Sequence, residues 1–298
     1  MSHPIPRPPI FTKTSLILVS VLVVCISGYS SEAPRYRVGV CDWMILKRQK
    51  LGAFQLAKEL GANGVEVDMG GLGNRPTFDN QLVKPEVRDQ FLAKAKELNL
   101  GIPSIALSGF YAQSFATRDG VDRMVQDAID TAKAMGVTVL FLPLGVQGDL
   151  VQHPELRPAI VERLKLAGRQ AAMAGMVLGV ETALDAKGDA ALLDEVGSPS
   201  LKIYFNLANA LQNGRDPCAE LKILGKDRIV QIHASNKDGF WLEKDPQVDL
   251  AKIKATLDEM GWSGWLVIER SRDGARPTDV KYNFTANAAY LKKVFQAK

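Results

Sequence analysis

The segment "KELGANGVEVD" (residues 58–68) contains the unit from which most of the chain is built. Its pattern predicts the end of a helix, then a glycine, then a short apolar strand with a polar residue at its end. Gly61 stands where a helix ends in the left-handed conformation, which glycine adopts without steric cost. The same order recurs in "AKAMGVTVLFLPLG" (132–145), "AMAGMVLGVETALD" (172–185), "LGKDRIVQIHASN" (224–236) and "DEMGWSGWLVIER" (258–270). A repeated helix–strand unit predicts a parallel sheet covered by helices.

Apolar runs of strand length predict eight strands, at about residues 36–41, 64–68, 102–107, 137–144, 176–182, 201–206, 228–234 and 264–269. The segments between them have the helical period, as in "PEVRDQFLAKAKEL" (85–98). Eight such units predict an α/β protein with a single (β/α)8 barrel over residues 34–298. A doubly wound sheet is the alternative, but "GGLGNR" (70–75) places Pro76 where a phosphate-binding fingerprint needs its third glycine.

The N-terminal segment differs from the rest of the chain. The apolar run "SLILVSVLVVCISG" (15–28) follows Arg7 and Lys13. Its length suits the core of a signal peptide better than a membrane span, which needs about 20 residues. We expect residues 1–33 to be a signal peptide or, if uncleaved, an N-terminal anchor that is the only contact with a membrane. The folded part is then exported, to a periplasm or outside the cell.

Composition excludes some partners. The net charge of +4 includes Arg7 and Lys13 of the N-terminal segment, and no basic stripe follows, so nucleic acid is not an expected partner. Of the cysteines beyond the N-terminal segment, we expect Cys41 and Cys218 to be free thiols with a structural role. The sequence leaves homo-oligomerisation open.

The last four predicted strands all close with a polar side chain: Glu181, Asn206, His233 and Glu269. The C-terminal ends of barrel strands carry the catalytic residues of this fold. A carboxylate buried there without a partner costs several kcal/mol. One divalent cation would satisfy all four, and mixed oxygen and nitrogen ligands suit Mn²⁺, Mg²⁺, Co²⁺ or Zn²⁺. Pairing with Arg270 or Arg272 is the alternative.

The chain resembles the xylose isomerase-like TIM barrel superfamily, in particular sugar (phosphate) isomerases and epimerases of the D-tagatose 3-epimerase type. The resemblance covers nearly all of the predicted barrel and rests on "GANGVEVD" (61–68), "LGVETA" (178–183), "YFNLANAL" (204–211), "IHASNKDG" (232–239) and "GWLVIE" (264–269). It implies one divalent metal ion bound by a residue from each of the last four strands. Asn206 stands where the family has aspartate, which lowers the formal ligand charge from −3 to −2.

The resemblance also implies a reaction. A proton beside a carbonyl is removed and returned through an enediolate, with the metal ion as Lewis acid and Glu181 and Glu269 as the two proton carriers. Because phosphorylated sugars are mostly cytoplasmic, an exported enzyme is expected to act on a non-phosphorylated sugar or keto-sugar. Two alternatives stay open: a non-catalytic sugar-binding barrel, and a lyase or hydrolase acting on a keto-glycoside.

Residues after the other strands are candidates for contact with the sugar. The aromatic ones can stack on a sugar face or simply seal the barrel, Glu66 is expected to bind a hydroxyl, and the remaining charged ones are candidate polar partners. The set comprises Trp43, Glu66, Phe110, Tyr111, Lys237, Asp238, Trp241 and Arg270.

Overall fold

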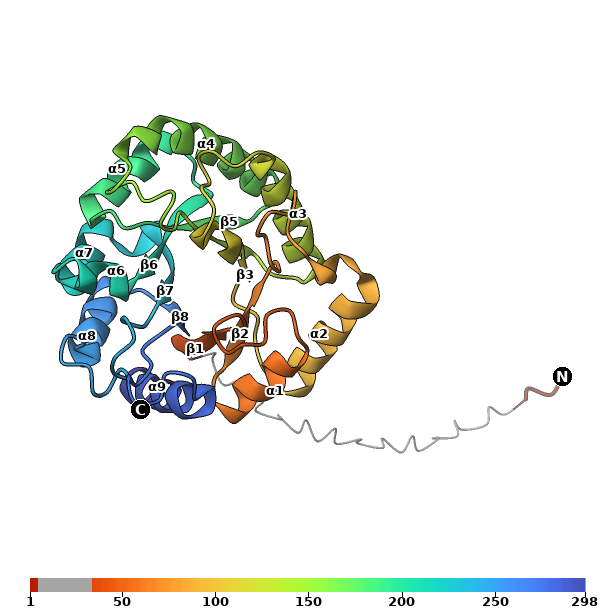
Figure 1. Cartoon of the computed structure of the whole chain (residues 1–298). Coiled ribbons are helices and arrows are strands. Elements are labelled where there is room, and N and C mark those ends of the chain that lie inside the picture. The colour runs from red at the N-terminus through yellow and green to blue at the C-terminus, as the bar shows by residue number, and fades with distance from the viewer. Residues whose placement is uncertain (5–33, 298) are drawn as a thin grey trace. The chain divides into compact units, whose positions relative to one another are not determined.

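The computed structural model describes residues 1–4 and 34–297. From residue 36 the chain forms a closed barrel of parallel strands, which occupies the centre of Figure 1. The strands follow one another in chain order, and the last pairs with the first. They are β1 Tyr36–Cys41, β2 Gly64–Asp68, β3 Ile105–Ala106, β4 Val139–Pro143, β5 Val177–Glu181, β6 Leu201–Asn206, β7 Ile229–His233 and β8 Gly264–Ile268. The (β/α)8 barrel predicted from the sequence is confirmed.

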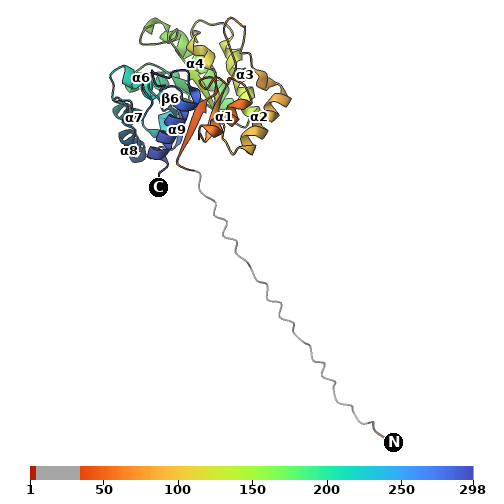
Figure 2. The ribbon, with the colours of Figure 1, turned by 60° about the horizontal axis from the view of Figure 1, so that its bottom comes forward.

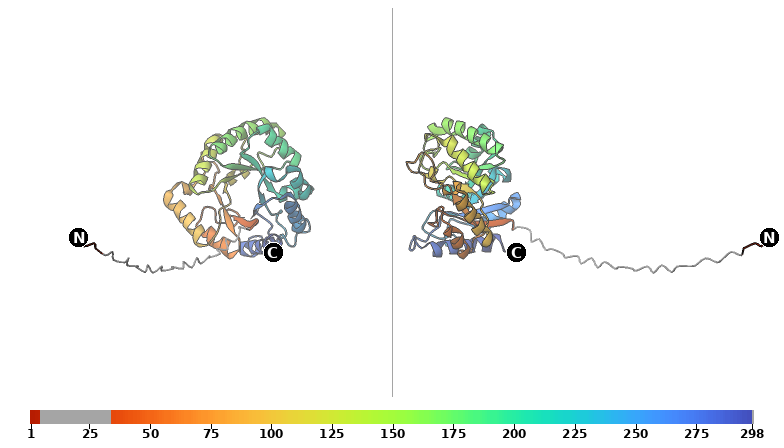
Figure 3. Two further views of the ribbon diagram at one scale, coloured as in Figure 1. Left: turned by 180° about the vertical axis from the view of Figure 1, so that it is seen from behind. Right: turned by 90° about the vertical axis from the view of Figure 1, so that its right-hand side faces the viewer.

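Helices alternate with the strands and cover the outside of the barrel, as Figures 1 and 3 show. The α-helices are α1 Gly52–Glu59, α2 Pro85–Glu97, α3 Val121–Ala134, α4 Arg157–Met173, α5 Ala186–Val196, α6 Leu207–Gln212, α7 Pro217–Leu224, α8 Leu250–Met260 and α9 Val280–Phe295. Short 3₁₀ turns are η1 Gln81–Val83, η2 Ser108–Tyr111, η3 Pro154–Leu156 and η4 Lys226–Arg228. In Figure 2, α9 lies beside the first strand, where the rings of Phe295 and Tyr36 meet edge to face with centroids 5.1 Å apart.

The predicted strand and helix ends agree closely with the structure. Gly61 after α1 and Gly261 after α8 have φ of 81° and 68°, the left-handed conformation expected at these helix ends. The main difference is β3, which is shorter than the predicted strand 102–107. Pro103 lies in that stretch and has no N–H to donate to the ladder, so regular pairing begins only at Ile105.

The predicted signal segment lies outside the described residues, except for residues 1–4, and stays a prediction. Among the residues that the structure describes, no helix is both long and apolar enough to cross a membrane. Cys41 and Cys218 are both free and buried, as expected from the sequence.

The interior of the barrel holds its own apolar cluster, separate from the core between strands and helices. At the N-terminal end of the strands Trp265 fills the barrel, with the guanidinium of Arg37 4.3 Å from the centre of its ring. The ring leaves no room at Gly64 of β2, where a Cβ would lie 2.6 Å from Trp265 Cη2 and 2.5 Å from the carbonyl oxygen of Gly101. Glycine is therefore required at position 64 because of packing.

Gly64→Ala should destabilise the barrel by about 1–3 kcal/mol, since the added methyl group overpacks a rigid aromatic contact. Urea denaturation would measure the change. Gly52→Ala is the matched control, because a Cβ at this helical residue meets no atom within 4 Å. Equal stability of the two variants would contradict the packing argument.

Candidate active site

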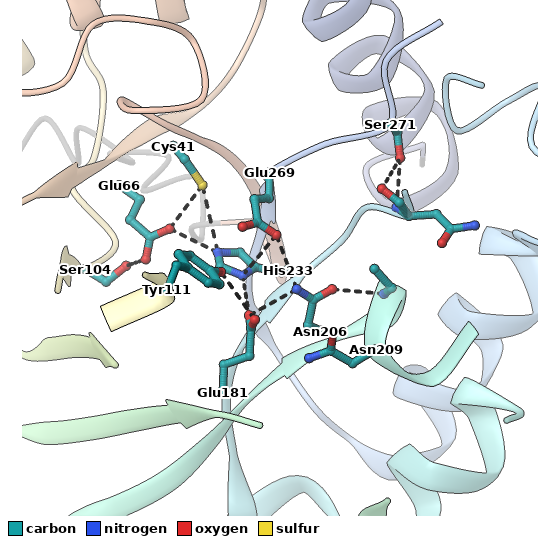
Figure 4. Close-up of polar contacts among 12 residues, drawn as sticks. Cys41, Glu66, Ser104, Tyr111, Glu181, Asn206, Asn209, His233, Glu269 and Ser271 are labelled. Carbon is teal, nitrogen blue, oxygen red and sulfur yellow. Dashed lines mark hydrogen bonds and ion pairs between the residues drawn. The ribbon is translucent and has the colours of Figure 1, made fainter. Parts of the chain in front are cut away.

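His233 lies at the centre of the candidate site, at the end of β7. Its side chain is completely buried, and both ring nitrogens face carboxylates. Nδ1 lies 2.8 Å from Oε2 of Glu181, and Nε2 lies 3.2 Å from Oε2 of Glu66 (Figure 4). The rings of Phe141 and Tyr204 pack against the imidazole at centroid distances of 4.8 and 4.5 Å, which fixes its orientation.

The polar ends of β5, β6 and β8 meet on the Nδ1 side of His233, as the sequence predicts. Nδ2 of Asn206 donates to Oε2 of Glu181 at 3.1 Å and to Oε2 of Glu269 at 3.3 Å. Both carboxylates therefore face one point, occupied by the amide nitrogen (Figure 4). Oδ1 of Asn206 accepts a hydrogen bond from the backbone N–H of Ala208 at 2.9 Å and caps α6.

The charges around His233 shift the pKa values of the site. Burial alone would lower the pKa of His233, but its contacts with Glu181 and Glu66 outweigh burial and raise this pKa well above the usual value. Burial raises the pKa of Glu181, and the hydrogen bond with His233 opposes this rise. Without a metal ion, these contacts favour the charged imidazolium over the neutral imidazole.

A second layer lies on the Nε2 side of His233, deeper in the barrel. Oε2 of Glu66 accepts from Cys41 Sγ at 3.3 Å, and Oε1 accepts from Ser104 Oγ at 2.7 Å. Burial, followed by the charge of Glu66, raises the pKa of the Cys41 thiol well above its usual value, so it is a neutral donor. Cys41, Glu66 and His233 place ligand atoms within 4.8 Å of one another, so this buried set also meets a geometric requirement for holding a cation.

On the pocket side of His233, three residues have ligand atoms that are spaced suitably for one divalent cation. Nδ1 of His233 is 2.8 Å from Glu181 Oε2 and 4.0 Å from Glu269 Oε2. Ligand atoms about 2.1 Å from a shared ion lie roughly 3 to 4 Å from one another, so these spacings are suitable. Asn206 does not fit in the same way, because the atom that faces the site is a nitrogen that carries hydrogens.

A pocket of about 330 Å³ opens over these residues, a size within the usual range for small-molecule sites. Glu181, Asn206 and Glu269 form part of its wall. Tyr111 lies beside them and donates from its hydroxyl to Oε1 of Glu181 at 3.2 Å. Arg270, next to Glu269 in the chain, is exposed at the same pocket. The sequence placed these two residues among the predicted sugar contacts, and both line this pocket.

Several other predicted sugar contacts lie elsewhere. Glu66 has no exposed surface and lies beneath His233, not on the pocket wall. Phe110 is fully buried between other phenylalanines, and Trp43 stacks on Phe141 inside the barrel with centroids 6.3 Å apart. Trp43 thus belongs to the cluster inside the barrel and Phe110 to the larger core, and neither lines the pocket.

The predicted contacts after β7 also lie apart from this pocket. Lys237 and Asp238 line a different pocket, together with Phe240. In that loop Asp238 accepts a hydrogen bond from the backbone N–H of Arg272 at 3.0 Å. The ring of Trp241 packs on Tyr282 of α9, with centroids 4.9 Å apart.

The pocket residues that were not predicted from the sequence include Asp149, Asn209, Gln212 and Asn213. Asn209 could have been found, because it follows Asn206 by three residues on the next helix and therefore lies on the same face. Its Nδ2 donates to the carbonyl of Thr182 at 2.8 Å, which ties α6 to the end of β5. Asp149 lies in a loop with no periodic pattern and gave no such signal.

The barrel and the strand-end residues define a class of protein, and comparison identifies it. The family described as xylose isomerase-like TIM barrel matches residues 54–294, so the chain belongs to that family. A curated relative, 2-epi-5-epi-valiolone 7-phosphate 2-epimerase from an Actinoplanes species, is 29% identical over 209 residues, which are 68% of this chain and 73% of that protein.

Solved structures share the fold at low sequence identity. A 3-keto-D-glucoside 4-epimerase from E. coli has a TM-score of 0.66 and 14% identity, covering 87% of this chain and 99% of its own. D-psicose 3-epimerase from Clostridium cellulolyticum has a TM-score of 0.65 and 11% identity, with the same coverage of 87% and 99%. Membership of the xylose isomerase-like TIM barrel family, predicted from the sequence, is confirmed, and the proteins that this chain is similar to include sugar epimerases.

Proposed function

We propose that this chain is a divalent-metal-dependent sugar isomerase or epimerase, in which Glu181 and Glu269 carry the proton. The observation that carries the proposal is the convergence of the two carboxylates on the nitrogen of Asn206, at the wall of the pocket. Two proton carriers beside one bound sugar are what removal and return of a proton require. A protein that only binds sugar has no need of this arrangement.

The residues of the site have separate tasks in this reaction. One glutamate removes the proton beside the carbonyl and the other returns it, with the order set by the configuration of the substrate. The hydroxyl of Tyr111 holds Glu181 in place from the pocket side. Glu181, His233 and Glu269 would hold the cation, which supplies Lewis-acid stabilisation of the negative charge that develops at the carbonyl oxygen.

The lining of the pocket supports a substrate without phosphate. Of the described residues that line it, Arg270 alone is cationic, whereas Asp149 adds a negative charge to those of the two glutamates. Phosphate recognition usually combines several cationic or backbone N–H donors. The apolar segment 15–28 supports export, which would separate the protein from most sugar phosphates. We therefore propose a free sugar or a keto-sugar as the substrate.

Incubation in D₂O tests the reaction and the substrate together. The Mn²⁺-loaded full-length protein would be given free ketoses, 3-keto-glycosides and their phosphates. We expect deuterium at the carbon beside the carbonyl in an otherwise intact, non-phosphorylated product, followed by mass spectrometry and NMR. Release of the glycosidic group would identify a lyase or hydrolase instead. Saturable binding without exchange would identify a binding protein, and activity on phosphates alone would refute the proposed substrate class.

A further inference from the structure

Asn206 stands where a fourth metal ligand is expected, but its side chain directs a hydrogen-bond donor at the site, whereas a metal ligand would direct a lone pair there. Its amide nitrogen, not its oxygen, is directed at the point where the carboxylates of Glu181 and Glu269 meet. This orientation follows from the partners. The two carboxylates act as acceptors there, and the backbone N–H of Ala208 on the other side can only donate, so it must receive the amide oxygen.

Reversing the amide would break the contacts on both sides. The NH₂ group would then face the N–H of Ala208, so that two donors meet and the first turn of α6 loses its cap. At the other end, the amide oxygen would replace the donor that now holds Glu181 and Glu269. An aspartate would not face this choice, because one of its oxygens could cap α6 while the other faced the site.

We propose that Asn206 is a hydrogen-bond donor to the two glutamates and not a metal ligand, so that the site binds a divalent cation only through three side chains and weakly. A single substitution, Asn206→Asp, then converts it into a tight four-ligand site. This inference concerns the same site as the proposed function, but it is tested by metal binding alone and needs no substrate or turnover.

The test is Mn²⁺ binding to the full-length protein after removal of metal with a chelator, measured by isothermal titration calorimetry. Asn206→Asp should raise the affinity for Mn²⁺ at least about tenfold, because a carboxylate adds both a ligand atom and a charge. Asn206→Ala should leave the affinity unchanged or raise it, because it removes the cap of α6 and a donor that faces the cation, but no metal ligand. Loss of Mn²⁺ binding in Asn206→Ala would overturn the proposal, since it would show that the amide oxygen coordinates.

Gln212→Glu is the matched control, because it adds the same charge to the wall of the same pocket on an exposed side chain. Its Mn²⁺ affinity should stay close to that of the wild type. An equal gain in Gln212→Glu, or no gain in Asn206→Asp, would overturn the proposal. Aspartate caps helices as well as asparagine does, and the rise in melting temperature on addition of Mn²⁺ is a second readout, expected to be larger for Asn206→Asp than for the wild type.

The proposal and the proposed function can fail separately. If the wild type binds no Mn²⁺ and Asn206→Asp does, the role of Asn206 stands and metal dependence of the natural chain fails. If the wild type binds Mn²⁺ tightly and Asn206→Ala does not, metal dependence stands and the proposed role of Asn206 is wrong.

Discussion

Glu181→Gln and Glu269→Gln should each lower kcat/KM for the sugar reaction by about 10²- to 10⁴-fold, the usual contribution of a positioned acid or base. Glutamine keeps the shape of the side chain but cannot carry a proton. At position 181 its oxygen can still accept from His233 and Asn206, while its NH₂ group can donate to the hydroxyl of Tyr111. The barrel is therefore expected to fold normally, and the loss would come from proton transfer and from weaker binding of the cation.

Steady-state kinetics and deuterium exchange would check this result. Glu162→Gln serves as the control, because Glu162 is exposed on α4 and does not line the pocket. If exchange at the carbon beside the carbonyl continued at the wild-type rate in both glutamine variants, the two-glutamate mechanism would be refuted. Retained sugar binding without turnover is the expected outcome.

The fold could be predicted because each strand carries its own signal. Continuous apolar runs such as 139–143 and 264–268 are typical of strands in a sheet covered on both faces. The glycines that follow the helices mark where each helix ends before the next strand. Pairing along β3 was less predictable, because Pro103 stops the ladder without changing the apolar character of its stretch.

The positions of the strand-end residues could be predicted for a similar reason. Glu181, Asn206 and His233 are each the last residue of their strand, and Glu269 directly follows β8, so the fold itself brings them to one end of the barrel. Loop residues such as Phe110 and Trp241 have no such constraint. Phe110 packs against Phe78 and Trp241 packs against Tyr282, so their positions depend on residues far away in the sequence.

Glu66 was predicted to contact the sugar, but it lies within its strand and not at the strand's end. It lies two residues before the end of β2, which is Asp68, and so it is about 7 Å deeper in the barrel than the strand end. At this depth a carboxylate has no access to substrate but can reach the far nitrogen of His233. Alternation along the strand points Glu66 and Asp68 to the same side, but Asp68 does not line the pocket either and pairs with Arg48 at 3.2 Å.

We expect Glu66→Gln to lower kcat/KM by about 10- to 100-fold, the usual effect of losing the partner that orients a metal-binding histidine. Glu66 accepts from Nε2 of His233, which leaves Nδ1 for the pocket side. Its hydrogen bond and charge also raise the pKa of His233. The neutral amide should lower that pKa, so that the imidazole loses its proton and can bind the cation at a lower pH, and the acidic limb of kcat/KM should move to lower pH. A purely structural role would not move the pH profile.

Ser104→Ala provides the matched comparison for Glu66→Gln. It removes one hydrogen bond to the same carboxylate, the 2.7 Å bond to Oε1, but keeps the charge of Glu66 and its contact with His233. Its pH profile should therefore match that of the wild type even if stability falls. The same profile in all three proteins would mean that Glu66 does not act through His233. A shift confined to Glu66→Gln would show that the buried carboxylate of Glu66 sets the pKa of His233. Among the described residues, no other carboxylate contacts Nε2 of this histidine.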